Sequence, residues 1–362
     1  MVNSMVEWKK LGDISEIGTG SNNREDCSEN GLYPFFVRSK DILRIDKYLY
    51  DEEAILIPGE GGVGEIFHYI NGKYGLHQRT YRVHPFSSDI KGKYLYYYLQ
   101  ENFRNYIHHK SYKSTAASIR RPMLTEFPLA IPPLSEQSRI VSILDTFTAS
   151  IDNLKKQIAE RRKQYEYERD QLLDLEGKEG VEMKKLGEVG DICMCKRIMK
   201  NQTSDTGDIP FFKIGTFGGK ADAYISRELF EEYKSKYSYP QKGDILISAA
   251  GTIGRSVVFD GEDAYFQDSN IVWIANDEKL VKNTFLRYIY SIADWKTDGG
   301  TIKRLYNYNL KNTIIPVPSL QDQSRIVSIL DTFEASIANL EAQLKLREKQ
   351  YEYYRNQLLT FE

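Results

Sequence analysis

Long apolar runs and paired cysteines are both missing from this chain of 362 residues. No apolar stretch approaches the roughly 18 residues that a membrane-spanning helix needs, so we expect no membrane contact. The three cysteines (Cys27, Cys193 and Cys195) form no CxxC pair and no Cys/His set with zinc spacing, which argues against a disulfide framework and a structural metal. The first residues lack the charged start and apolar stretch of a secretory signal, so we expect a cytoplasmic protein.

The chain also lacks a strong charge of either sign. Its 49 basic and 51 acidic side chains leave a formal net charge of −2, so the whole molecule has no field that would steer it towards nucleic acid. Any DNA binding must therefore be local. Tyrosine is abundant, with 26 copies, and its side chain can both stack and donate a hydrogen bond at an interface.

Several segments match part of a catalytic motif, but each lacks residues that the motif requires. The glycine run at 59–65 (GEGGVGE) has Glu65 where a nucleotide-binding loop needs a lysine, and its counterpart at 249–256 lacks the first glycine. The sequence IPPL at 131–134 has Ile131 and Leu134 where an amino-methyltransferase needs a hydrogen-bond acceptor and an aromatic ring. Two Glu-x-Lys fragments, at 7–9 and 182–184, lack a preceding strand aspartate. We therefore expect a chain that is not an enzyme and binds no metal.

An internal repeat decides the architecture. The eleven residues QSRIVSILDTF occur at 137–147 and again at 323–333. KQYEYERDQLL at 163–173 matches KQYEYYRNQLL at 349–359, and WKKLGD at 8–13 resembles MKKLGE at 183–188. The halves are therefore duplicates. Because similarity fades between these markers, we expect two domains of common fold that contact different targets.

The duplicated segments predict two long helices. After Pro132 and Pro133, Ser135 is a candidate N-cap, and apolar residues then recur with the 4,3 spacing of a heptad seam. About 40 residues of helix span roughly 60 Å, so each helix needs a partner. Its duplicate is the economical choice, and pseudo-twofold symmetry favours antiparallel pairing. The alternative is that each helix packs on its own domain. The predicted seam consists of Ile140, Leu144, Phe147, Ile151, Leu154 and Ile158, and of Ile326, Leu330, Phe333, Ile337, Leu340 and Leu344.

The segments before the helices mix short β-type runs with one or two helical stretches, which predicts an α/β fold. We expect domains at 1–134 and 183–319, helices at 135–176 and 320–362, and a linker at 177–182. Between 67 and 124, ten lysines and arginines stand against only Asp89 and Glu101, and tyrosines are interleaved with them. This pattern predicts a basic patch suited to phosphates and groove edges.

The second half carries its basic residues more diffusely. The segment 294–309 occupies the place that 108–122 holds in the first half, and each runs into the start of a long helix. Gln78 and Gln267 are expected to correspond, and amides can read adenine. The predicted DNA contacts are Arg38, Lys40, Gln78, Arg79, Lys110, Lys113, Arg120 and Arg121, and Lys196, Arg197, Lys213, Arg255, Gln267, Asn270, Lys296, Lys303 and Arg304.

With its two helix starts (IPPLSEQSRIVSILD and VPSLQDQSRIVSILD), its WKKLGD and MKKLGE segments and the run GGTIKRLYNYNLKN at 299–312, the chain resembles the specificity subunit of type I restriction-modification systems. The resemblance covers essentially all 362 residues. The first half departs from it at 118–127, where SIRRPMLTEF replaces the fuller pattern.

The resemblance implies that each variable domain is a target recognition domain for one half of a bipartite, gapped DNA site, with the paired helices as a ruler. It implies methyltransferase (modification) subunits and motor-nuclease (restriction) subunits as partners. S-adenosylmethionine, ATP and Mg²⁺ belong to those partners, and this chain binds no cofactor. Two alternatives remain open from the residues: a stand-alone DNA endonuclease and a non-catalytic coiled-coil scaffold.

Overall fold

The structure is a computed structural model that describes residues 6–110, 118–298 and 303–361. The chain forms two compact units, and two long helices run through both of them. Unit 1 comprises Met1–Gln157 and Leu340–Glu362, and unit 2 comprises Ile158–Asn339. The helices are α4 (Leu134–Leu173) and α9 (Leu320–Leu359). Each unit therefore contains part of both helices.

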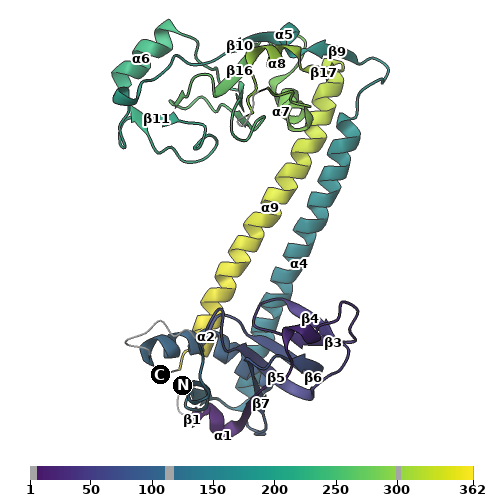
Figure 1. Ribbon diagram of the computed structural model, residues 1–362, viewed down its shortest axis with the longest axis vertical. Coiled ribbons are helices and arrows are strands. Elements are labelled where there is room, and N and C mark those ends of the chain that lie inside the picture. Colours follow the sequence, from purple (N-terminus) through teal and green to yellow (C-terminus); the bar gives the residue numbers. More distant parts are fainter. Residues whose placement is uncertain (1–5, 111–117, 299–302, 362) are drawn as a thin grey trace. The chain divides into compact units, whose positions relative to one another are not determined.

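Unit 1 is an α/β domain built on one six-stranded sheet in the order β2-β7-β5-β6-β3-β4 (Figure 1). Most neighbours are antiparallel, whereas β3 and β6 run parallel. A separate antiparallel pair, β1-β8, joins the start of the chain to the strand before α4. The elements are β1 (Glu7–Lys10), α1 (Leu11–Ile14), β2 (Ser15–Thr19), η2 (Arg24–Asp26), β3 (Tyr33–Phe36), β4 (Ile42–Ile45), β5 (Tyr50–Pro58), β6 (His68–Leu76), β7 (Thr80–Pro85), α2 (Gly92–Lys110), α3 (Arg121–Thr125) and β8 (Pro128–Ile131).

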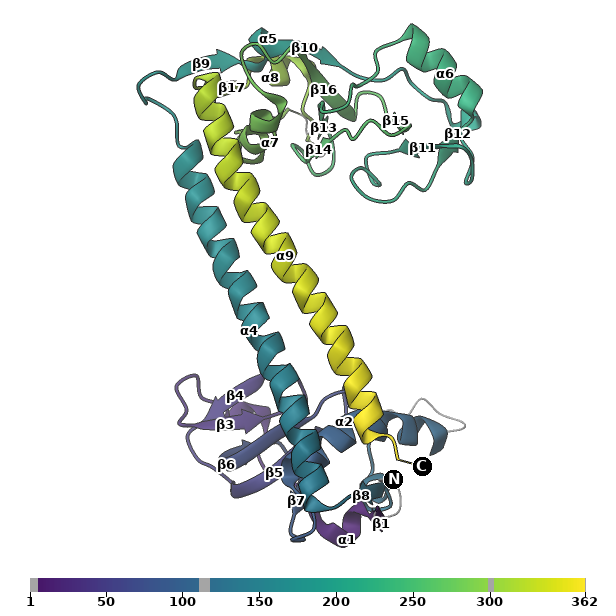
Figure 2. The ribbon, with the colours of Figure 1, turned by 180° about the vertical axis from the view of Figure 1, so that it is seen from behind.

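Unit 2 repeats this plan with its sheet divided in two, in the orders β10-β16-β13-β14 and β12-β11-β15 (Figure 2). The pair β17-β9 corresponds to β1-β8. The elements are β9 (Glu182–Lys185), α5 (Leu186–Val189), β10 (Gly190–Cys193), η3 (Lys200–Gln202), β11 (Ile209–Phe212), β12 (Tyr224–Ile225), α6 (Arg227–Lys236), β13 (Ile245–Ser248), β14 (Ser256–Val258), β15 (Tyr265–Phe266), β16 (Ile271–Asn276), α7 (Asn283–Ile292), α8 (Asn307–Asn312) and β17 (Ile314–Val317).

The hydrophobic cores explain why α2 and α7 are helices in the same place. Tyr94, Leu95, Tyr98 and Leu99 are buried in unit 1, and their spacing forms one apolar face of α2 against β-strand residues and the start of α4. Helix α7 buries a corresponding face in unit 2. Unit 2 has a second core, around α6 and β11, where the sheet is divided. The predicted α/β class and the duplicated scaffold are confirmed.

A buried glutamine fixes each long helix to its domain. Gln137 accepts a hydrogen bond from the backbone N–H of Lys91 at 2.8 Å and donates to the carbonyls of Asp89 and Pro132. Gln323 repeats this arrangement, accepting from Lys282 at 2.8 Å and donating to the carbonyls of Leu280 and Pro318. Both glutamines are 0% exposed. The repeated glutamine therefore joins the start of each long helix to the loop before α2 or α7.

The predicted N-cap at Ser135 is wrong. Helix α4 already begins at Leu134, and the carbonyl of Pro133 accepts from the N–H groups of Glu136 and Gln137. In α9 the residue that corresponds to Pro133 is Ser319, whose hydroxyl accepts from the N–H of Asp322 at 3.1 Å. The residue before α4 is therefore Pro133, two positions earlier than the predicted cap, and a proline there supplies only its carbonyl.

The long helices pair in antiparallel fashion within each unit. In unit 1, Phe147 of α4 packs against Tyr351 and Tyr354 of α9, and Lys155 is paired with Glu348. Later residues of α4 therefore contact earlier residues of α9. In unit 2, Tyr165 of α4 contacts Phe333 and donates to Glu334 of α9 at 3.0 Å. The predicted direction is confirmed in both units.

The predicted seam divides into two parts. Ile140 and Leu144 are buried in the core of unit 1, and Ile326 and Leu330 in that of unit 2, so the first two turns of each helix pack on its own domain. Farther along, Ile151 and Ile158 are buried. The other predicted seam positions are partly buried: Phe147, Leu154, Phe333, Ile337, Leu340 and Leu344. Within the part of the chain that the structure describes, no helix is long and apolar enough to cross a membrane.

Candidate nucleic-acid interface

A polar corner forms in unit 1 where three loops meet. The glycine run 59–65 leaves the end of β5, and the N–H of Gly59 donates to the carbonyl of Arg79 in the β6–β7 turn at 2.9 Å. The carbonyl of Gly59 accepts from Ile119, in the segment before α3, at 2.7 Å. Gly61 has a φ of 71°, a backbone conformation that favours glycine. The glycine run is thus a strand-to-turn feature that joins these loops.

Glu60 is the centre of this corner. Its Oε2 accepts from Nη1 of Arg79 at 2.9 Å and from Nη1 of Arg38 at 3.1 Å. The hydrogen bond from Arg79 contributes most to lowering the pKa of Glu60, so the carboxylate is charged. Arg38, Glu60 and His77 line a cavity of about 190 Å³. We call Arg38, Glu60, His77 and Arg79 corner 1.

His77 stabilises the β6–β7 turn of corner 1. Its side chain is buried, and Nδ1 accepts from the backbone N–H of Arg79 at 3.0 Å. Burial lowers the pKa of the imidazole, which keeps the ring neutral and able to accept. Beside it, Gln78 is exposed and donates to Oδ1 of Asn23 at 2.6 Å. Corner 1 is therefore held rigid by side-chain and backbone hydrogen bonds.

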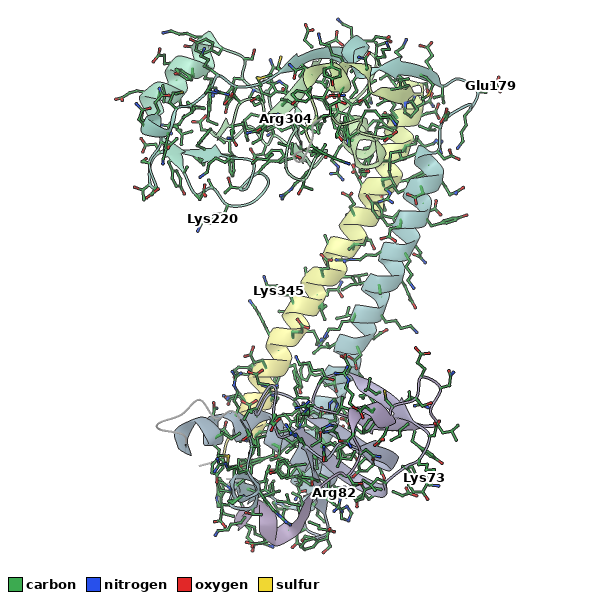
Figure 3. All side chains as sticks on the ribbon, in the orientation of Figure 1. Lys73, Arg82, Glu179, Lys220, Arg304 and Lys345 are labelled. Carbon is green, nitrogen blue, oxygen red and sulfur yellow. The ribbon has the colours of Figure 1, made fainter. Side chains whose placement is uncertain are left out.

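Unit 2 has a corner of the same backbone design. The N–H of Ala249 donates to the carbonyl of Asn270 at 2.7 Å, and the carbonyl of Ala249 accepts from Leu305 at 2.9 Å. Arg304 donates to the carbonyl of Ser269 at 2.9 Å and to Oδ1 of Asn270 at 2.7 Å. Figure 3 shows Arg304 among the side chains of unit 2. Arg197 is paired with Asp268 at 3.0 Å. Corner 2 comprises Arg197, Asp268, Ser269, Asn270 and Arg304.

The expected correspondence of Gln78 with Gln267 is wrong by one position. Gln267 donates its backbone N–H to the carbonyl of Phe212, and His77 makes the same bond to Phe36. Gln267 therefore corresponds to His77. Its Oε1 accepts from the N–H of Ile214 at 3.0 Å, so this amide serves the local backbone. The turn from Gln267 to Asn270 in unit 2 is one residue longer than the turn from His77 to Arg79 in unit 1, and this extra residue hid the correct alignment.

Several predicted DNA contacts are engaged elsewhere in their units. Arg121 donates to the carbonyl of Ile17 at 2.6 Å, and Arg255 donates to the carbonyl of Gly218 at 3.3 Å. Three lysines have local partners: Lys196 over the ring of Tyr237, Lys213 with Asp222, and Lys296 with Asp294. These residues do not gather at the corners.

Three predicted contacts are exposed, and their side chains have no ionic or hydrogen-bond partner among the described residues: Lys40, Arg120 and Lys303. Arg120 and Lys303 precede α3 and α8, beside the loops that complete the two corners. Lys113 lies outside the described residues, as does the side chain of Lys110.

The basic patch predicted between 67 and 124 is smaller than its composition indicated. Arg82 is nearly buried and paired with Glu52 at 2.6 Å and Glu16 at 2.8 Å (Figure 3). Lys93 is paired with Asp145, and Arg104 with Glu65. The acidic partners lie outside the counted segment, so folding neutralises charges that the linear count treated as free.

Glu60 and Asp268 are the functional candidates that sequence reasoning missed. Each is an acidic residue that binds an arginine at the corner of its unit. The sequence did distinguish Glu60, because it stands inside the glycine run 59–65 and the residue that corresponds to it in the second half is the uncharged Ala250. Within residues 6–110, 118–298 and 303–361, no group of three His, Cys, Asp or Glu side chains could hold a metal ion.

Comparison with known proteins identifies relatives over the whole chain. The sequence matches the type I restriction modification DNA specificity domain twice, over residues 3–161 and 178–347. A Haemophilus influenzae protein named as a type I restriction enzyme specificity subunit is 45% identical, over 99% of this chain and 96% of that protein. The EcoR124I/EcoR124II specificity subunit of Escherichia coli is 32% identical, over 74% of this chain and 70% of its own length.

Solved structures share the fold. The S subunit of a type I restriction-modification system from M. genitalium superposes with a TM-score of 0.64 at 15% identity, covering 99% of this chain and 98% of its own. A chain from a structure of type I system assembly gives a TM-score of 0.61 at 16% identity, covering 99% and 97%.

Proposed function

The chain belongs to the DNA specificity subunits of type I restriction-modification systems, and we propose that its two domains each read one half of a bipartite, gapped site on double-stranded DNA. A specificity subunit is not itself an enzyme, because catalysis lies in other subunits of the system. Two readers of one scaffold would supply one contact region for each half-site.

The observation that carries this proposal is the chemical difference between the two corners. Their backbone hydrogen bonds match, with Gly59 bonded to the loop residue Ile119 in unit 1 and Ala249 to Leu305 in unit 2. Their side chains differ, since Glu60 in corner 1 stands where Ala250 stands in unit 2. Base edges are distinguished by the donors and acceptors presented to them. Equal scaffolds with unequal side chains therefore favour two different half-sites.

The paired helices supply the distance between the half-sites. Their antiparallel contacts recur in the two units at positions that correspond in the repeat, such as Phe147 with Tyr351 and Phe333 with Tyr165. A helix rises about 1.5 Å per residue, so helix length converts directly into reach along a duplex. We propose that α4 and α9 act as the ruler for the non-specific gap.

We further propose methyltransferase (modification) subunits and motor-nuclease (restriction) subunits as the partners. In this arrangement, S-adenosylmethionine, ATP and Mg²⁺ would be bound by those partners and not by this chain. The run QSRIVSILDTF lies near the start of both α4 and α9, so the two halves offer similar surfaces to a partner that binds twice. Double-stranded DNA is the ligand of the corners.

The proposal is tested by co-expressing the chain with a methyltransferase subunit from the same genome and sequencing the methylated bases of the host DNA. A gapped, two-part methylated motif that disappears without this chain is the expected result. Absence of both copurification and new methylation would overturn it. Cleavage of DNA with Mg²⁺ by the purified chain alone would instead favour the stand-alone endonuclease.

A further inference from the structure

Corner 1 combines charges in a way that phosphate binding does not explain. A surface carboxylate repels the DNA backbone, and Glu60 occupies one guanidinium edge of both Arg38 and Arg79. The exposed fractions of the three side chains are 46%, 38% and 56% for Arg38, Glu60 and Arg79, so a duplex could reach all of them. An arginine that served only to attract phosphates would bind better without this carboxylate.

The geometry leaves one edge of Arg79 free. Arg79 donates Nη1 to Glu60, while Nε and Nη2 have no partner among the described residues. These two groups form a parallel pair of donors, the pattern that binds O6 and N7 of guanine in the major groove. A carboxylate on the opposite side holds the guanidinium plane in one orientation.

The backbone of Arg79 is fixed as firmly as its side chain. Its N–H donates to Nδ1 of His77, and its carbonyl accepts from Gly59 at 2.9 Å. A side chain that is anchored at both ends loses little conformational freedom when it binds. Rigid placement matters more for base recognition than for phosphate attraction, because a phosphate accepts donors from many directions.

We propose that corner 1 reads a guanine·cytosine pair in the half-site of unit 1, with Arg79 contacting the guanine and Glu60 positioning the arginine. Arg38 binds the same carboxylate oxygen from the other side and keeps Glu60 in place. This inference rests on the proposed function and names what one recognition surface reads. Glu60 contributes through Arg79 and is a positioning residue.

Unit 2 holds an arginine differently, since Asp268 accepts from Nε of Arg197 and so occupies the edge that Arg79 leaves free. Ile214 and Ala250 stand where Arg38 and Glu60 stand in unit 1, and Nη2 of Arg304 donates to Ser269 and Asn270. The dependence on Arg79 is therefore confined to one half-site. The second half-site serves as an internal reference in every measurement.

The test uses the full chain in complex with its methyltransferase subunits and duplexes that carry each base pair in turn at every position of the methylated motif. The Arg79→Lys variant keeps the charge but cannot bind bidentately. We expect it to reduce discrimination at one guanine·cytosine position of a single half-site by about 10-fold or more, the size of a lost bidentate contact. Binding to unrelated DNA and its salt dependence should stay unchanged.

The Glu60→Gln variant separates positioning from charge. We expect weaker discrimination at the same base pair, together with unchanged or tighter binding to unrelated DNA because a repulsive carboxylate is gone. Glu65→Gln is the matched control, since Glu65 lies in the same glycine run and is paired with Arg104 at 2.9 Å. It removes the same charge and should leave discrimination intact. Thermal unfolding of each variant complex verifies that the fold is retained.

Two results would overturn the inference. In one, Arg79→Lys leaves the preference at every position intact. In the other, Arg79→Ala and Arg79→Lys weaken all sequences equally and lower the salt slope, as loss of a phosphate contact does. If the wild-type complex shows no sequence preference at all, the proposed function fails instead. The two failures are therefore distinguishable.

Discussion

The guanidinium group of Arg161 lies over the ring of Phe333, 5.7 Å from its centroid. Arg347 lies over Phe147 at 5.6 Å in the other unit. These four residues are two copies of one pair, because 161 and 347 correspond in the repeat, as do 147 and 333. An arginine of one helix meets the aromatic residue of the other in both units. The arginine at a seam position is thus explained by its aromatic partner.

This relationship predicts the effect of removing either arginine. Arg161→Ala and Arg347→Ala should each lower the free energy of unfolding by about 0.5–1 kcal/mol, the size of an exposed cation–π contact. The double variant should lose the sum, because the two pairs share no residue. Chemical denaturation measures these differences. Lys345→Ala is the control, since this exposed lysine of α9 points away from α4 (Figure 3). An equal loss in the control would contradict the prediction.

The buried glutamines provide a second prediction. Gln137→Ala would leave the N–H of Lys91 and two carbonyls without their partner inside the fold, which costs about 1–3 kcal/mol for each buried group left unsatisfied. Gln323→Ala should cost a similar amount in unit 2, because it makes the same three bonds. Thermal unfolding measures both losses.

A matched control is available on α9, the helix that carries Gln323. Gln343 is exposed, so Gln343→Ala should leave the unfolding temperature within the range of ordinary surface changes. If Gln137→Ala behaved like this control, the glutamine would not be the lock between helix and domain.

The long helices and the duplicated domains follow from the sequence because their signals are local and periodic. The run QSRIVSILDTF appears twice, and heptad spacing needs no knowledge of distant residues. The corners are different, because their chemistry depends on pairs that are remote in the chain. Arg304 reads as a free cation next to Lys303, yet it donates to Ser269 and Asn270 some 35 residues earlier. Lys303 has no such partner among the described residues. Only the folded chain separates the two.

The same long-range pairing gives unit 1 a pH dependence. Burial raises the pKa of Glu52, but hydrogen bonds from Arg82 and Tyr74 outweigh it and leave the pKa below its ordinary 4.5. A group whose folded pKa is depressed contributes stability above its ordinary pKa and loses it as pH falls through the folded pKa. At pH values below about 4.5, the unfolding temperature of unit 1 should therefore decrease.

Glu52→Gln should reduce that fall and should lower stability at pH 7 by about 2 kcal/mol, because a charged hydrogen bond to Arg82 is lost. Glu7→Gln is the comparison, since Glu7 is a more exposed carboxylate in unit 1. Unfolding scans between pH 7 and pH 3.5 measure the difference, and parallel curves for wild type and Glu52→Gln would contradict it.

Exposed cations without partners make the next prediction. Arg120→Ala and Lys303→Ala should each weaken binding to all DNA sequences and reduce the salt slope by about 1, as expected for a single phosphate contact. Arg121→Ala and Arg304→Ala should act mainly on stability, since both side chains donate to backbone carbonyls of their own unit. Binding measured at several salt concentrations separates the two classes. An unchanged slope for Arg120→Ala and Lys303→Ala would remove them from the interface.

Changing both helices together tests the ruler. Seven residues are two helical turns, so inserting seven between 157 and 158 of α4 and seven between 339 and 340 of α9 keeps the heptad pattern in both. Each helix gains about 10 Å, which is close to the rise of three base pairs in B-DNA. The methylated motif should therefore keep both half-sites and gain about three base pairs in its gap. Inserting four residues in each helix lengthens them by about 6 Å but rotates the apolar positions by about 40°, so the seam is disturbed and methylation should fall. An unchanged gap with the seven-residue insertions would mean that the helices do not set the spacing.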